Sequence, residues 1–166
     1  MLSRDFPFMR IPKSIQVSLL AVVAVLGACS TMNKSETKSE LRQRAQSGDI
    51  DARFQLGKKY ADAAFSNKPE AIYWLCLAAR DGHVPAQMRL ASLFEADAVS
   101  GRDTTGKGRL SNRGSAYFWY TAAASQGDDQ AYSSRTALAA GMDSAEIENV
   151  KRKATRWQQA GCVKPS

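Results

Sequence analysis

The residues of one stretch, 51–82, return in the same order further along the chain. Six positions match: Ala52 with Ala86, Leu56 with Leu90, Trp74 with Trp119, Ala78 with Ala123, Ala79 with Ala124, and Gly82 with Gly127. A period in the thirties is typical of helical solenoids, in which each unit is a helix pair that buries its apolar face against a neighbouring unit. The repeat therefore predicts an all-α fold.

Each copy is expected to hold two helices. In the first copy, apolar residues at spacings of four run from Ala52 to Tyr60, and a second helical stripe begins at Ala71. Pro69 suits the first turn of that second helix because an N–H there has no intrahelical acceptor, and Gly82 suits its end.

These residues resemble the Sel1-like repeats, an α/α-solenoid family related to tetratricopeptide repeats, with the approximate pattern A-x-x-x-L-G-x-x-Y, a short loop, and K-A-x-x-W-[YL]-x-x-A-A-x-x-G. The first copy matches with Ala52, Leu56-Gly57, Tyr60, Glu70-Ala71, Trp74-Leu75, Ala78-Ala79 and Gly82. The second matches with Ala86, Leu90-Ala91, Phe94, Ser115-Ala116, Trp119-Tyr120, Ala123-Ala124 and Gly127. Ala91 departs from the usual Gly, and neither copy has the usual G-x-G-V loop. The resemblance implies an α/α solenoid of about two repeats over residues 40–160 and a role in partner binding.

Capping helices are expected at both ends of this solenoid. Leu41 and Ala45, followed by a Gly48-Asp49 turn, indicate a preceding half-unit, and the third unit loses the motif at Arg135. Asp143 is a predicted N-cap. The last helix then has an apolar stripe at Ile147, Val150, Ala154 and Trp157 and a basic face at Lys151, Arg152, Lys153 and Arg156. That face fits either a solvated surface or a site for nucleic acid or lipid headgroups. Residues 161–166 form a tail.

Residues 1–28 have the pattern of a secretory signal. Basic residues precede an apolar run at 17–26 that is too short to span a bilayer. The run ends in Leu26-Gly27-Ala28-Cys29, which resembles the bacterial lipobox and implies cleavage before Cys29 and lipid attachment to its sulfur. An ordinary signal with a coincidental cysteine is the alternative, and translation from Met9 instead of Met1 would give a more ordinary signal.

Residues 29–39 are polar and predict a flexible tether. Several acyl chains would hold such a protein on a membrane, whereas one chain is marginal. Ser30 after the cysteine favours the outer membrane of the bacterial envelope, facing the periplasm, because an Asp there retains lipoproteins in the inner membrane in enteric-type sorting.

The second copy carries an insertion at 97–113 that is rich in glycine and basic residues. Its candidate partner contacts are Arg102, Lys107, Arg109 and Arg113. Residues 101–108 resemble a phosphate-binding loop, but Gly108 stands where a Ser or Thr must hold Mg²⁺ and no buried strand precedes it. We therefore expect no nucleotide. A solvated loop and a loop that contacts a partner or polyanion both remain open, since repeat insertions often lie on a binding face.

No catalytic set is apparent, so we expect no enzyme, cofactor or metal. His83 is the only histidine and lies in a predicted turn, and the sequence has no CxxC and no Ser/His/Asp arrangement.

Cys76 and Cys162 are the two thiols left once Cys29 is lipidated, in a compartment that oxidises thiols. The resemblance places Cys76, second after Trp74, at an outward position. The two cysteines form either a disulfide or two independent thiols.

The net charge of +7 falls to +5 on maturation, since removing three basic residues and one acidic residue leaves 20 basic and 15 acidic. A moderate excess of this kind suits anionic headgroups or cell-wall polymers. We expect no nucleic-acid partner, because export removes the chain from the compartment that holds nucleic acid.

The function expected is a membrane-anchored envelope lipoprotein that acts as an adaptor for another envelope protein. The alternative is a protein that binds or acts on the cell wall.

Overall fold

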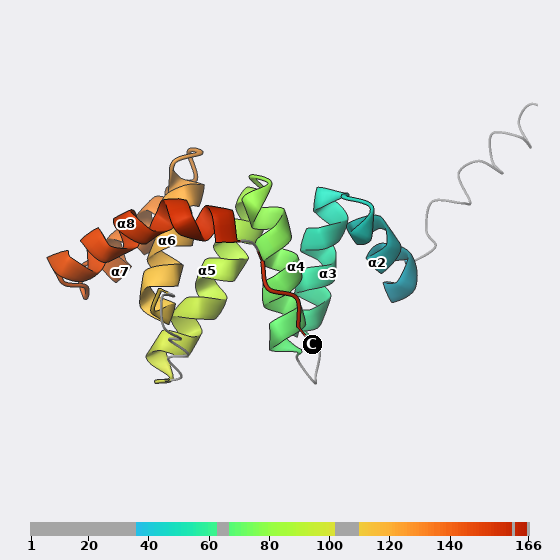
Figure 1. The fold of residues 1–166 in the computed structure, drawn as a ribbon, viewed down its shortest axis with the longest axis horizontal. Coiled ribbons are helices and arrows are strands. Elements are labelled where there is room, and N and C mark those ends of the chain that lie inside the picture. The colour runs from blue at the N-terminus through green and yellow to red at the C-terminus, as the bar shows by residue number, and fades with distance from the viewer. Residues whose placement is uncertain (1–35, 63–66, 102–109, 161, 166) are drawn as a thin grey trace, which may run out of the picture. The chain divides into compact units, whose positions relative to one another are not determined.

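The computed structural model describes residues 36–62, 67–101, 110–160 and 162–165, with only the backbone described for 155–160. Within these ranges the chain forms seven α-helices and no β-strand, which confirms the all-α class (Figure 1). The helices are α2 (Lys38–Gln46), α3 (Ile50–Asp62), α4 (Lys68–Arg80), α5 (Val84–Val99), α6 (Asn112–Ala124), α7 (Asp129–Ala139) and α8 (Ser144–Ala160). All seven belong to one compact unit, Thr37–Ser166. The expected signal peptide, Cys29 and the tether as far as residue 35 lie outside the described residues.

Helices that follow one another in the chain pack side by side from α2 to α7, and α8 packs on α6 (Figure 1). Two buried clusters fill the space between them. The first includes Leu56 from α3 and Trp74 from α4, and the second includes Leu90 from α5 and Trp119 from α6. Each cluster thus contains the Leu and Trp of one sequence copy.

Three helices begin at turns of the same geometry. Gly48, Gly82 and Gly127 take φ values of +103°, +86° and +89°, which favour glycine. The next residue in each turn donates its N–H back to the preceding helix, from Asp49 to Arg44, His83 to Ala78 and Asp128 to Ala123, at 3.2, 3.1 and 3.4 Å. The side chains of those same residues then accept the N–H of Ala52, Ala86 and Ala131, at 2.9, 3.1 and 2.7 Å. Each turn therefore ends one helix and caps the next.

Gly57 sets the close approach of α3 to α4. A Cβ at this position would lie 2.6 Å from Cγ of Leu75 and 3.0 Å from its backbone nitrogen. Both residues are buried, and Leu75 is 0% exposed. The Leu-Gly pair in the first sequence copy is therefore a packing requirement, since real Cβ atoms essentially never come within 3.0 Å of a non-bonded heavy atom.

The first described helix starts earlier than the boundary expected at residue 40. Thr37 caps α2 by accepting the Glu40 N–H, and the Glu40 carboxylate accepts the Thr37 N–H at 2.9 Å. This reciprocal capping box satisfies two N–H groups that would otherwise lack partners, so the helix begins at Lys38. Leu41 and Ala45 are buried against α3 as the apolar spacing predicts.

The loop between α5 and α6 is shorter at both ends than the insertion predicted at 97–113. Asp97 lies inside α5, is 9% exposed and forms an ion pair with Lys68 at the start of α4. At the other end, Leu110 is buried and Ser111 caps α6 by accepting the Gly114 N–H at 2.9 Å. The ion pair and the cap explain why both ends of the predicted insertion belong to helices.

Asp143 caps α8 as predicted, since its carboxylate accepts the Glu146 N–H at 2.7 Å. Val150 is buried, whereas Ile147 and Ala154 are half-buried. The side chains of Arg156 and Trp157 lie outside the described residues. Along the described ranges, no helix combines the length and apolarity needed to cross a membrane.

Candidate functional site

A groove of about 710 Å³ runs across one face of α3, α5 and α7, and we call it the α3–α7 groove. Its lining residues are Phe54, Lys58, Asp62, Pro85, Met88, Arg89, Ser92, Tyr120, Asp128, Gln130 and Ser134. Only Tyr120 comes from α6; Asp128 is the N-cap of α7, and the other residues come from α3, α5 and α7. Ligand sites are commonly concave surfaces of this size.

The repeated turns explain why these residues share a face. Phe54 and Met88 are each the fifth residue after their N-caps, Asp49 and His83. In the same way Lys58 and Ser92 are each the ninth, Pro85 and Gln130 the second, and Arg89 and Ser134 the sixth. Because each helix starts from a turn of the same geometry, residues at equal distances from the caps point to the same side.

The charged part of the groove centres on Arg89. Its guanidinium Nη2 donates to the Asp62 carboxylate across the gap between α5 and α3. Lys58, one turn before Asp62 on α3, holds its ammonium 5.7 Å from the centre of the Phe54 ring. Asp128 lines the far side, where its carboxylate caps α7.

Tyr120 forms the floor of the groove and is 4% exposed. Its hydroxyl donates to the Glu95 carboxylate at 2.7 Å. Burial raises the pKa of the Tyr120 phenol above its ordinary value of 10.0, and the neighbouring Glu95 carboxylate raises it further, while a hydrogen bond with Ser134 opposes them. The phenol therefore stays protonated and links α6 to α5.

His83 serves the turn between α4 and α5, as predicted. Its Nδ1 accepts the Ala86 N–H at 3.1 Å, and its ring lies 4.6 Å from that of Phe54. Nδ1 acts as an acceptor, so the proton belongs on Nε2, which lies 3.1 Å from the Asp51 carboxylate. Through the ring contact, the turn also supports one wall of the groove.

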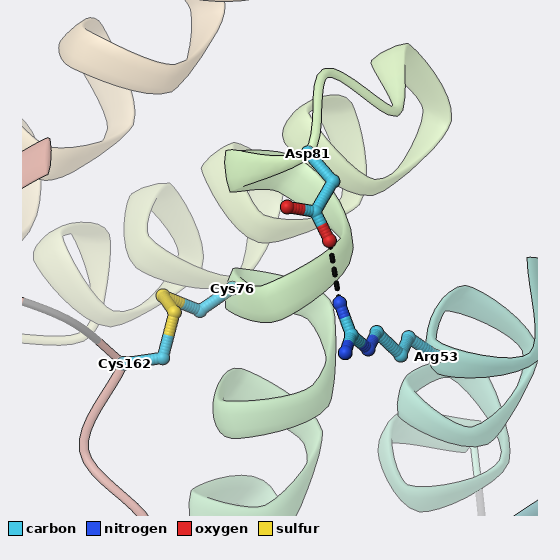
Figure 2. The surroundings of a disulfide bond; sticks show 4 residues. All are labelled: Arg53, Cys76, Asp81 and Cys162. Carbon is cyan, nitrogen blue, oxygen red and sulfur yellow. Dashed lines mark hydrogen bonds and ion pairs between the residues drawn. A yellow bond between two sulfur atoms is a disulfide. The ribbon is translucent and has the colours of Figure 1, made fainter. Parts of the chain in front are cut away.

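A second feature is the disulfide between Cys76 of α4 and Cys162 in the tail after α8 (Figure 2). Their Cα atoms are 5.8 Å apart, and the two cysteines are 86 positions apart in the sequence. Cys76 is 8% exposed, although the Sel1-like resemblance implies an outward position. The difference arises because Cys162 packs against the cluster that contains Cys76.

The opposite side of α4 is tied to α3 by an ion pair (Figure 2). Arg53 Nη1 lies 2.5 Å from the Asp81 carboxylate, and its Nε donates to the Ala45 carbonyl at 3.1 Å. One arginine thus joins the carboxyl ends of α2 and α4. Cation contacts of this kind at helix C-termini also complement the helix dipole.

Of the other residues singled out from the sequence as contact or attachment sites, the structure describes Arg113. Cys29, Arg102, Lys107 and Arg109 lie outside the described residues. Arg113 is in the first turn of α6 and donates from Nη1 to the Gly141 carbonyl at 3.1 Å. Arg113 therefore contacts the turn between α7 and α8.

Sequence reasoning missed the groove residues, of which Lys58, Asp62, Arg89 and Asp128 are charged. The available signal was their spacing from the predicted turns at Gly48, Gly82 and Gly127. In the described part of the chain, no group of three or more His, Cys, Asp or Glu side chains could hold a metal ion.

Neither a protein-family model nor a curated protein sequence matches this chain.

Proposed function

We propose that the chain is a membrane-anchored envelope lipoprotein that acts as an adaptor and binds another envelope protein through the α3–α7 groove. The observation that carries this proposal is the groove itself, because it is lined by equivalent positions of α3, α5 and α7. Surfaces of this kind suit an extended or helical segment of a partner, since equivalent side chains recur along the line of binding.

We further propose that α3–α4 and α5–α6 are the two Sel1-like units of a short α/α solenoid, with α2 and the α7–α8 pair as caps. Three turns of the same geometry support this arrangement. The packing of neighbouring helices supports it as well. The polar exposed face of α2, with Lys38, Arg42 and Gln46 exposed, suits a terminal cap.

The proposed anchor is Cys29, and its support is the lipobox pattern in the sequence. The tether to Thr37 would place the groove in the periplasm if the anchor is in the outer membrane. Metabolic labelling with a fatty-acid probe tests this step. The Cys29→Ser variant should lose the label and Cys162→Ser should keep it, whereas equal labelling of all three proteins would refute the anchor.

A second candidate, cell-wall binding, is favoured by a specific observation. Arg152 on α8 and Lys164 in the tail are both exposed, and Lys151 is exposed beside Glu148. Such cations suit anionic wall polymers.

Pull-down with the purified mature protein separates the two candidates. Membrane extract and isolated peptidoglycan are offered in parallel, and the bound partner is identified from wild type and from a groove variant, Met88→Glu. The adaptor proposal predicts a membrane protein captured by wild type and lost with the variant. A protein that binds peptidoglycan alone, equally for both, would contradict it.

A further inference from the structure

We propose that the partner segment in the α3–α7 groove presents a carboxylate beside an apolar side chain. This inference rests on the proposed function, in that it assigns the chemistry of the occupant of the same groove. It follows from how the charged groups of the groove are already engaged, and from which apolar side chains lie beside them.

The groove's acidic groups already have partners. Asp62 accepts from Arg89. Asp128 accepts the Ala131 N–H at 2.7 Å, and Glu95 beneath the floor accepts the Tyr120 hydroxyl at 2.7 Å. Each of these carboxylates therefore already accepts at least one hydrogen bond within the chain.

The groove's cationic groups are less completely engaged. Arg89 Nε is buried and has no hydrogen-bond partner among the described residues, although its Nη2 is paired with Asp62. A buried donor without an acceptor is unfavourable, and a carboxylate is the geometric match for the forked guanidinium. Pairing with Nε requires the guanidinium to turn toward the groove, which its 39% exposed side chain permits.

Lys58 supplies the second cation. Its ammonium lies over the Phe54 ring, a contact that leaves its three N–H groups available to an acceptor. Lys58 and Arg89 line the same groove from α3 and α5, and Asp62, paired with Arg89, lies one turn after Lys58. The groove as a whole is lined by two basic and two acidic side chains, and Asp128 lies at its α7 end. A carboxylate placed beside Lys58 and Arg89, at the α3–α5 end, would face both cations and only Asp62 of the two acidic groups.

The apolar half of the site is formed by Phe54 and Met88, which occupy equivalent positions on α3 and α5. Both are half-buried. An aromatic ring and a flexible methionine suit an aliphatic or aromatic side chain of the partner. The two cations and the two apolar side chains together favour binding of a protein segment in which an acidic residue lies next to an apolar residue.

Display of random twelve-residue peptides on the mature protein tests the inference. We expect the enriched peptides to contain Asp or Glu beside an apolar residue. Synthetic copies should bind Arg89→Gln and Lys58→Gln about tenfold more weakly, as expected for losing a charge-assisted hydrogen bond. Lys59→Gln is the matched control, because Lys59 neighbours Lys58 but does not line the groove, and it should bind as wild type does.

Arg89→Lys distinguishes loss of the guanidinium from loss of the fold. Lysine keeps the positive charge beside Asp62, so this variant should retain part of the binding. Thermal melts of each variant complete that control. Enrichment of basic or purely apolar peptides whose binding Met88→Glu abolishes would overturn the inference and leave the proposed function standing. Failure to enrich any peptide that depends on the groove would overturn both.

Discussion

Gly57 has no Cβ, and this allows α3 to pack closely against Leu75 of α4. Alanine normally stabilises a helix interior by roughly 0.5–1 kcal/mol relative to glycine. Here the added methyl would meet the Leu75 backbone nitrogen at 3.0 Å as well as its side chain. Backbone cannot move aside as a flexible side chain can, so the clash outweighs the gain in helix propensity.

We therefore expect Gly57→Ala to lower the free energy of unfolding by about 1–3 kcal/mol, the usual cost of overpacking. Urea denaturation measures it. Gly141→Ala is the matched control, because a Cβ there would meet nothing closer than 3.8 Å. An alanine variant at 57 that is as stable as wild type would show that α3 and α4 are not in this close contact.

Tyr120 gives a second prediction at the residue scale. Its folded-state pKa is raised above 10.0, mainly by burial. The protonated phenol therefore favours the fold, and this contribution is complete below pH 10 and is lost as the pH rises through the folded-state pKa. Wild type should lose stability above about pH 10 more steeply than Tyr120→Phe does.

Spectrophotometric titration of phenolate checks this directly. About one pH unit above 10.0, native wild type and native Tyr120→Phe should show equal phenolate absorbance, because Tyr120 stays protonated. After unfolding in guanidinium, wild type should exceed the variant by the signal of one of its five tyrosines. A difference of that size already present in the native proteins would contradict the burial of Tyr120.

Among the structural elements, the tail after α8 depends on one covalent bond to α4. The Cys76–Cys162 disulfide closes a loop that contains α5, α6, α7 and α8. In the chain-entropy model, cross-linking residues 86 apart stabilises by roughly 4–5 kcal/mol. That is a large part of the stability of a domain of this size.

Reduction should accordingly lower the Tm of wild type by on the order of 10 °C or more. Cys162→Ser should melt like reduced wild type and should not respond to the reductant. Mass spectrometry of non-reduced, alkylated protein from the envelope provides the second readout. Two alkylated cysteines there, or a Tm unchanged by reduction, would mean that the bond does not hold the tail in the native protein.

The helices could be predicted from the sequence wherever a local rule fixes them. Gly82 and Asp143 were expected as a helix end and a cap, and both serve in that way because φ and hydrogen bonding are decided by neighbouring residues. The end of α5 was not predicted, because Asp97 is held in the helix by Lys68, 29 residues earlier in the chain. The groove was missed for a similar reason, since Arg89 of α5 meets Asp62 of α3 only in the folded chain, 27 positions apart in the sequence.

For the molecule as a whole, the proposed function combines a proposed lipid anchor, a proposed tether and the α3–α7 groove. Each of the three parts is tested by a different experiment. The proposed adaptor function requires that the groove is the surface that contacts the partner inside the envelope. A groove position and a control position lie on the same helix, as with Gln130 and Thr136 on α7. Both are exposed, so a substitution at either position removes no buried side chain.

Photo-crosslinking in the producing cells makes that test most directly. A photoreactive amino acid is placed at Gln130, which is exposed and lines the groove, or at Thr136, which is exposed on the same helix and does not line the groove. The proposed adaptor function predicts an adduct with one membrane or periplasmic protein from Gln130 and none from Thr136. Identical adducts from both positions, or no protein adduct from Gln130 in a chain that reaches the envelope, would contradict it.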